Sequence, residues 1–323
     1  MSSEQPRMQR PRVGFVGVGT MGEPMALNLL RSGRVSAVLL YARSPQRLEG
    51  LVAAGATVSP TPRHLAEASD VIVSMLPDLP ELHTLLLGEG GEHSEHSEHS
   101  ILAGIRSPTL LVISSTSAPE GVRELAAQLA VDTRGLLRVI DAPVSGGPEG
   151  AASAELSIMV GGDAADFKIV EPILRAMGTP VLLGPLGSGQ VAKACNQLIV
   201  ASTMLALAEA SVIAERSGLD LARLLPVLQG GYAGGRLLDT RAQRLIEKDY
   251  SVLGAAKLLV KDLGFARTQA EVTGTVAPQL TAAYDTYSDL VDRGFGEQDM
   301  SVAQAYVSSL LFRHSDAHPL PPF

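Results

Sequence analysis

The chain of 323 residues contains one cysteine, Cys195, no tryptophan, and only 4% aromatic residues. A single cysteine excludes an intrachain disulfide and is typical of proteins from a reducing compartment. Basic residues are also in deficit, with 26 Lys and Arg against 34 Asp and Glu and a net charge of -8. This balance argues against nucleic acid or an anionic membrane as the main partner, so a small anionic substrate would be bound by local basic groups.

Long apolar runs are absent as well. The most apolar segment, Leu198 to Ala208, ends at Glu209 and is predicted to be too short to cross a membrane. Residues 1–11 are polar and rich in arginine, which predicts a disordered N-terminal extension rather than a signal peptide. With 46% hydrophobic residues, the chain is long enough for two domains with separate cores, and we expect a cytoplasmic enzyme.

The segment from Val13 to Leu30 contains a G-x-G-x-x-G motif between an apolar run and a helical pattern. In a dinucleotide-binding turn, Gly17 would permit the tight turn, Gly19 the close approach of a pyrophosphate, and Gly22 the packing of helix on strand. An ordinary strand-to-helix turn remains the alternative. The cofactor contacts predicted in this turn are Gly17, Gly19, Thr20, Met21 and Gly22.

The next predicted strand, Val38 to Tyr41, bears on the choice of cofactor. An acidic residue at its end would bind the 2'-hydroxyl of NAD, but the chain has Arg43 and Ser44 there, followed by Arg47. Guanidinium and hydroxyl groups suit the 2'-phosphate of NADP, so NADP is predicted, with NAD as the second possibility. The alternative is that these arginines are solvated surface charges.

Alternating strand and helix patterns predict a parallel sheet with helices on both faces, followed by an all-helical region. The boundary is predicted near Pro185 to Gly189, which gives an α/β domain over 12–186 and an all-α domain over 187–323. A helix is expected at Ala164 to Met177. Further strands are expected at Val71 to Met75, Thr109 to Ile113, Arg138 to Asp141, Leu156 to Val160, and Thr179 to Leu183.

A tripeptide repeat, Glu92 to Ser100, contains three histidines spaced three apart. Such histidines could share a helix face and bind zinc. The repeat is flanked by glycine and has no apolar anchor, so we predict a disordered loop without metal.

Two further motifs carry candidate chemistry. Ser145, Gly146 and Gly147 follow a predicted strand and could present a hydroxyl and backbone N–H groups to a carboxylate, although the same residues also form ordinary turns. Lys193 and Asn196 lie three apart and would share one face of an apolar helix. A surface lysine is the alternative there, and Cys195 is predicted to be a small core residue.

Five blocks in this order resemble the β-hydroxyacid dehydrogenase family over roughly residues 12–310. The matching blocks are Phe15 to Asn28, Ser115 to Pro119, Asp141 to Gly147, Gly187 to Gln197, and Lys261 to Leu263. The resemblance implies an α/β Rossmann-type N-terminal domain followed by an all-α C-terminal domain, with the active site between them.

The resemblance also implies residue roles. Lys193 would be the catalytic lysine, Asn196 a substrate-orienting amide, and Lys261 a cofactor contact from the second domain. Ser145, Gly146 and Gly147 would bind the substrate carboxylate, while Leu76, Pro77 and Thr116 would line the nicotinamide side of the cofactor. Two departures are Ser114, where many members have Asp, and the histidine-rich insert.

The predicted function is an NADP(H)-preferring oxidoreductase that interconverts a small β-hydroxyacid and its semialdehyde or keto form, with Lys193 as general acid and base. An imine reductase of the same fold and a non-catalytic cofactor-binding module are the alternatives. The resemblance and the apolar C-terminal helices predict a homodimer or homotetramer. The far end of the substrate would be recognised around Leu228 to Asp239, where Arg236 is a candidate for a second acid group.

Overall fold

The computed structural model describes residues 10–43, 48–88 and 97–310. The chain forms two compact units, Met1–Ala194 and Cys195–Phe323. The predicted N-terminal extension and the residues after position 310 lie almost entirely outside the described ranges.

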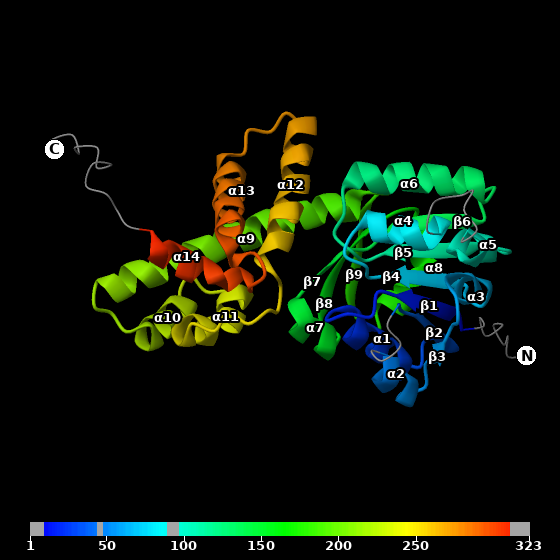
Figure 1. Cartoon of the computed structure of the whole chain (residues 1–323), viewed down its shortest axis with the longest axis horizontal. Coiled ribbons are helices and arrows are strands. Elements are labelled where there is room, and N and C mark those ends of the chain that lie inside the picture. The colour runs from blue at the N-terminus through cyan, green and yellow to red at the C-terminus, as the bar shows by residue number, and fades with distance from the viewer. Residues whose placement is uncertain (1–9, 44–47, 89–96, 311–323) are drawn as a thin grey trace, which may run out of the picture. The chain divides into compact units, whose positions relative to one another are not determined.

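The N-terminal unit contains a sheet of nine described strands in the order β3-β2-β1-β4-β5-β6-β8-β7, with β9 paired to β8 (Figure 1). Strands β1 to β6 pair in parallel, as the alternating pattern predicts. The strands are β1 (Arg12–Val16), β2 (Ala37–Tyr41), β3 (Thr57–Val58), β4 (Val71–Ser74), β5 (Thr109–Ile113), β6 (Leu137–Asp141), β7 (Val144–Ser145), β8 (Leu156–Gly161) and β9 (Gly178–Gly184).

Helices cover both faces of this sheet, and the strand residues alternate between two cores. In β5, Leu110 and Val112 pack on one side with α1, α2, α7 and α8, while Leu111 and Ile113 pack on the other with α3, α4, α5 and α6. This alternation explains why the buried strands read as continuous apolar runs. The helices are α1 (Gly22–Arg31), α2 (Glu49–Ala53), α3 (Pro62–Glu67), α4 (Leu79–Leu87), α5 (Ile101–Gly104), α6 (Pro119–Asp132), α7 (Gly147–Ser153) and α8 (Ala164–Leu174).

The sheet departs from the predicted all-parallel arrangement after β6. Strand β8 runs antiparallel to both β6 and β7. Strands β6 and β7 therefore run in the same direction, separated only by Ala142 and Pro143, and the chain reverses between β7 and β8. The connection there, residues 146–155, is shorter than the dozen or more residues that a parallel crossover requires. Asp141 at the end of β6 pairs with Gly161, and Ser145 pairs with Ser157, so both lie along β8.

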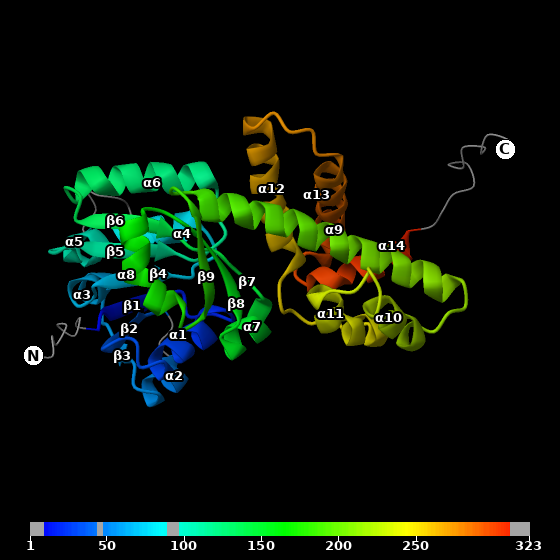
Figure 2. The same ribbon diagram turned by 180° about the vertical axis from the view of Figure 1, so that it is seen from behind.

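The C-terminal unit is helical, as predicted. Its core joins Met204 and Leu207 of α9 to Leu225 of α10 and to Leu238 and Leu245 of α11. Helices α12 and α13 lie side by side in both views (Figures 1 and 2). The elements are α9 (Ser188–Arg216), α10 (Leu221–Gln229), α11 (Arg236–Glu247), α12 (Ala256–Val272), α13 (Pro278–Leu290), a π-helical turn η3 (Val291–Phe295), a 3-10 helix η4 (Met300–Val302) and α14 (Ala303–Ser309).

Helix α9 is longer than the sequence pattern predicts. It runs for 29 residues, through Glu209, and among the described helices it alone is long and apolar enough to cross a membrane by length and composition. The prediction of a segment too short to do so is therefore wrong. Of its most apolar window, 44% is already buried inside the protein, and core helices of water-soluble proteins have the same composition, so the helix carries no argument for a membrane.

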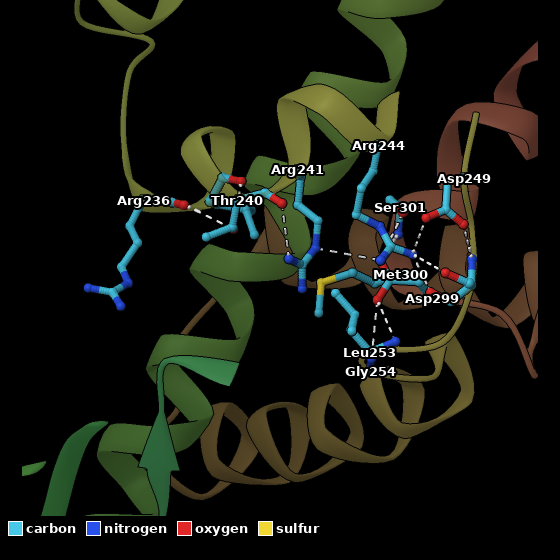
Figure 3. A network of polar contacts seen from close by, with 12 residues as sticks. Arg236, Thr240, Arg241, Arg244, Asp249, Leu253, Gly254, Asp299, Met300 and Ser301 are labelled. Atoms are coloured by element: carbon cyan, nitrogen blue, oxygen red, sulfur yellow. Dashed lines mark hydrogen bonds and ion pairs between the residues drawn. The ribbon is translucent and has the colours of Figure 1, made fainter. Parts of the chain in front are cut away.

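The C-terminal unit also contains a buried polar network (Figure 3). Asp299 is fully buried and accepts hydrogen bonds from the backbone N–H groups of Leu253, Gly254 and Ser301. The Nε of buried Arg241 lies 3.5 Å from its Oδ1. This network joins α11 to the segment before α12 and to η4.

The histidine repeat lies mostly outside the described residues. Its end is ordered: Ser97–His99 form the 3-10 helix η2, and buried Ser100 accepts a hydrogen bond from the N–H of Ala103 at the start of α5. The prediction of a disordered loop is therefore wrong for residues 97–100, because the seryl cap and Ile101 anchor this end. Among the described residues, no group of three His, Cys, Asp or Glu side chains is placed to hold a metal ion.

Candidate active site

The glycine-rich turn lies between β1 and α1. Gly17 has a φ of +89°, and a Cβ there would lie 2.4 Å from the backbone of Met75. A Cβ on Gly22 would lie 2.0 Å from the carbonyl oxygen of Gly17, whereas a Cβ on Gly19 would meet nothing within 4 Å. The turn therefore combines a tight bend, a close helix contact and open space beside backbone at a helix N-terminus, which fits the pyrophosphate of a dinucleotide.

Arg43 lies just after β2, the strand beside β1, and its side chain is exposed. This is the edge of the sheet where the glycine-rich turn also lies, because parallel strands end together. Ser44 and Arg47 fall outside the described residues, so their predicted phosphate contacts stay predictions.

Ser145, Gly146 and Gly147 connect β7 to α7. Gly146 and Gly147 have φ values of +134° and +66°, a backbone conformation that side chains disfavour. Asn28 of α1 donates a hydrogen bond to the carbonyl oxygen of Ala151 in α7 at 2.6 Å. The helix that follows the dinucleotide turn is thus tied to the helix that follows the predicted carboxylate cradle.

Asp141, the last residue of β6, fixes the start of α9. Its fully buried carboxylate accepts hydrogen bonds from the N–H groups of Gly187 at 2.7 Å and Gln190 at 2.8 Å. A Cβ on Gly161 or Gly189 would lie 2.4 Å or 2.7 Å from its oxygens, so glycine at these two positions makes room for the carboxylate. Burial raises the pKa of Asp141 to about 6, although the backbone N–H groups oppose this shift.

Lys193 lies in the second turn of α9, one turn after Gln190. Its side chain is buried, with 7% of its surface exposed, which is not what the alternative of a surface lysine predicts. Cys195 is exposed, so the prediction that it is a core residue is wrong.

The C-terminal unit orders the predicted residues Asn196 and Lys261 through a polar chain. Asn196 Nδ2 donates to Gln197 Oε1 at 2.9 Å, and Gln197 Nε2 donates to Asp262 Oδ2 at 2.7 Å. Lys261 Nζ lies 3.4 Å from Asp262 Oδ1 and 5.0 Å from the ring centre of Phe265. Because an ionised carboxylate only accepts, Asp262 sets the orientation of Gln197, which in turn sets that of Asn196.

The remaining predicted residues follow two central strands. Leu76 and Pro77 come just after β4, and Thr116 comes just after β5, so they lie at the same edge of the sheet as the glycine-rich turn. Ser114 is buried, and its hydroxyl has no hydrogen-bond partner among the described residues.

Substrate recognition was predicted around Leu228 to Asp239. An irregular segment, residues 230–235, lies there between α10 and α11, and Arg236 is exposed at the start of α11. Arg236 Nη and Nε atoms point away from the other labelled side chains in Figure 3.

Four polar residues that contact or position predicted site residues within their own units had no role assigned from sequence: Asp141, Gln190, Gln197 and Asp262. Each lies inside or next to a block that carries the family resemblance. The sequence does mark Asp141 as a candidate, because a carboxylate at the end of an apolar strand needs a hydrogen-bond partner if it is buried. The hydrogen bonds that connect the other three to residues 115, 117, 197 and 262 span 65 to 75 residues of the chain, which local spacing does not indicate.

Two family models match adjoining parts of the chain. Residues 12–187 match the NAD binding domain of 6-phosphogluconate dehydrogenase. Residues 187–307 match the NAD-binding domain of NADP-dependent 3-hydroxyisobutyrate dehydrogenase. The two models meet at Gly187, whose N–H Asp141 binds.

Known proteins are similar over almost the whole chain. An NAD-dependent L-serine dehydrogenase of Pseudomonas aeruginosa is 36% identical over 91% of this chain and 96% of its own length. A 2-hydroxy-3-oxopropionate reductase of Escherichia coli is 34% identical over 90% of this chain and 94% of its own.

A solved structure is also similar over almost the whole chain. The 3-hydroxyisobutyrate dehydrogenase of Mycobacterium tuberculosis, solved with L-serine, aligns with a TM-score of 0.76 and 29% identity over 94% of this chain and 100% of its own. Matching models, relatives and fold agree with the motifs described above. The chain belongs to the β-hydroxyacid dehydrogenase family.

Proposed function

We propose that the protein is an NAD(P)-dependent dehydrogenase that interconverts a small β-hydroxyacid and its semialdehyde or keto form, with Lys193 as general acid and base. The observation that carries this proposal is a buried lysine, Lys193, on a helix whose start is fixed to the strand that leads to the Ser145 turn. Burial of an ammonium group costs free energy unless the group is paired or hydrogen-bonded, and a lysine on this helix can exchange a proton with a reacting oxygen.

The chain's residues would divide the work as follows. A bound nicotinamide supplies or accepts the hydride. Lys193 gives a proton to the carbonyl oxygen in reduction and takes it from the alcohol oxygen in oxidation. The backbone of Gly146 and Gly147 and the hydroxyl of Ser145 bind the substrate carboxylate, and Asn196 orients the substrate.

We further propose that NADP(H) is preferred, with Arg43 and Ser44 binding the 2'-phosphate and Lys261 contacting the cofactor. The exposed guanidinium of Arg43 at the end of β2 supports this preference. The relative from Pseudomonas aeruginosa is named as NAD-dependent, so the ratio of kcat/KM for the two cofactors is the measurement that decides.

The names of the relatives suggest the substrates to test. A panel of L-serine, 3-hydroxyisobutyrate, 2-hydroxy-3-oxopropionate, glyoxylate, succinic semialdehyde and a cyclic imine separates the proposals. Turnover of hydroxyacids or aldehydes alone supports the dehydrogenase. Turnover of the imine alone would instead indicate an imine reductase, and binding of cofactor without any turnover a non-catalytic module.

Replacement of the lysine tests its role directly. Lys193→Ala should lower kcat by roughly two to four orders of magnitude and change the Kd for NADPH by only a few-fold, because the lost interaction belongs to the transition state. Lys168→Ala, at an exposed position of α8, is the control and should leave kcat unchanged. A Lys193→Ala enzyme that keeps more than a tenth of wild-type kcat would contradict the assignment.

We also propose a homodimer or homotetramer built through the C-terminal unit. Ile199 and Ile213 of α9 are 65% and 66% exposed, which is unusual for large apolar side chains on one long helix. Light scattering at micromolar concentration measures the assembly, and a monomer there would refute it.

A further inference from the structure

Gln190 binds two backbone groups on either side of Thr116. Its Nε2 donates to the carbonyl oxygen of Ser115 at 2.8 Å, and its Oε1 accepts from the N–H of Ser117 at 2.9 Å. The orientation of the amide is unambiguous, because a carbonyl only accepts and a backbone N–H only donates. Gln190 therefore pairs with residues 115–117 as a neighbouring strand would.

The same residue is also fixed through its backbone. The N–H of Gln190 donates to Asp141 Oδ2, and Gly187 donates to Oδ1 of the same carboxylate. Gln190 is 1% exposed, so solvent does not compete for these bonds. One residue thus joins three chain segments: the end of β6, the turn after β5, and the first turn of α9.

Two proposed active-site residues depend on these segments. Thr116 lies between the two residues that Gln190 binds. Lys193 lies three positions after Gln190 and therefore on the same face of α9. A shift of α9 along its axis would therefore break the contacts of Gln190 and displace Lys193 together.

We infer that Gln190 is a positioning residue, which holds the Thr116 turn and the Lys193 helix in register, with Asp141 as its anchor. This inference rests on the proposed function, since it assigns these contacts to the geometry of hydride and proton transfer. An amide is needed for the task, because an apolar side chain of similar size fills the same volume without binding residues 115–117.

The first test compares two methionine variants. Gln190→Met should lower kcat by about 10- to 100-fold, because a misplacement on the order of 1 Å is enough for such a loss, while the KM for substrate changes less. Gln128→Met, at an exposed position of α6, is the matched control and should leave kcat within two-fold.

A second readout does not need turnover. Hydrogen exchange, followed by mass spectrometry, should show faster exchange in the peptide that contains Ser117 for Gln190→Met, and unchanged exchange in β1, β4 and β5. Unchanged exchange at Ser117, or faster exchange throughout the unit, would overturn the inference, the latter because it indicates only a structural role. If the wild type turns over no substrate of the panel, the proposed function fails. The hydrogen-exchange comparison still tests whether Gln190 binds residues 115–117.

A titratable replacement gives the sharpest test. In Gln190→Glu, a protonated carboxyl can donate to Ser115 and accept from Ser117 as the amide does, whereas the ionised form repels the Ser115 carbonyl. The kcat of this variant relative to wild type should therefore rise at least five-fold as the pH falls from 9 to 7, and that of Gln190→Met should stay constant.

The charged groups near this position are Asp141 at the backbone N–H of Gln190, Lys193 one turn later, and Arg123, whose guanidinium donates to the carbonyl oxygen of Leu186. All three groups are present in every variant, and Gln190→Met, which adds no titratable group, is the reference for their effect on the pH profile. A pH-independent ratio for Gln190→Glu, with Gln190→Met at more than half of wild-type kcat, would overturn the inference.

Discussion

Among the described residues, each unit contains one fully buried aspartate whose carboxylate accepts hydrogen bonds from backbone N–H groups, and the two aspartates differ in their partners. Asp141 of the N-terminal unit accepts from Gly187 and Gln190, and burial raises its pKa to about 6. Asp299 of the C-terminal unit accepts from the segment before α12 and also lies 3.5 Å from the Nε of Arg241.

The different partners of Asp141 and Asp299 indicate different roles for the two carboxylates. An arginine beside Asp299 compensates its charge, and the network connects elements of one helical unit (Figure 3). Asp141 binds the start of the helix that carries Lys193, and two glycines make room for it. We therefore expect Asp299 to govern stability and Asp141 to govern both stability and activity.

The largest predicted effect on stability is at Asp299. Asp299→Asn should lower the free energy of unfolding of the C-terminal unit by about 3 to 5 kcal/mol, because it leaves the buried guanidinium of Arg241 without its counter-charge. Unfolding in guanidinium chloride measures the change in the free energy of unfolding. Glu297→Gln removes the exposed partner of Lys257 and is the control, with no resolvable change expected. A weaker Kd for NADPH in Asp299→Asn would contradict the division of purposes.

Asp141 should show a characteristic dependence of stability on pH. Its folded pKa is about 6 against an ordinary 3.8, so the folded state binds the proton more tightly than the unfolded state. The stabilisation is complete below pH 4 and is lost as the pH rises through 6. The free energy of unfolding of wild type minus that of Asp141→Asn should thus fall by about 2 to 3 kcal/mol between pH 4 and pH 7.

An aspartate with the opposite shift is the control for this experiment. The Arg12 guanidinium holds the pKa of Asp70 below its usual range, so the wild type minus Asp70→Asn difference should rise with pH, and by less because this pair is half exposed. A flat difference for Asp141→Asn would show that its carboxyl has an ordinary pKa.

The two units also differ in how much of them sequence could predict. In the N-terminal unit, glycines mark tight turns and short apolar runs mark buried strands, and both patterns are local in the sequence. The glycine-rich turn and strands β4, β5 and β6 were therefore predicted within about one residue. In the C-terminal unit, the helical period predicted the class of fold but not its polar contacts. Arg241 and Asp299 meet across 58 residues, and no local pattern marks such a pair.

The wrong predictions share a physical cause. Cys195 was predicted to be buried from its small size, yet burial depends on which face of α9 meets a neighbouring element. The end of α9 was predicted at Glu209 because a charge interrupts the apolar run, but exposed charges are compatible with a helix that is buried on one side. The parallel direction predicted for the sheet is wrong at β8, because the connection from β7 to β8, residues 146–155, is too short for a parallel crossover.

Replacement of Arg43, the predicted phosphate-binding arginine, should have an effect of intermediate size on cofactor binding. Arg43→Asp should weaken NADPH binding by about 1.5 to 3 kcal/mol, since it removes a charge-assisted contact and adds repulsion, and should raise the relative kcat/KM for NADH. Arg34→Asp, exposed at the opposite end of β2, is the control. A wild type that already prefers NADH would refute the predicted role of Arg43, although it would leave the comparison of the two aspartates intact.

The smallest effect is expected in the histidine repeat. Residues 92–96 carry no apolar side chain, and loop-closure entropy changes only slowly with length, so a Gly-Ser linker in their place should leave Tm and kcat/KM nearly unchanged. Ser100→Ala should differ, because it removes the hydroxyl that accepts from Ala103 N–H, at a cost of about 1 kcal/mol in the free energy of unfolding. Thermal melts compare the two variants. Stoichiometric zinc in untagged protein, with activity lost on chelation, would show instead that the repeat takes part in the reaction.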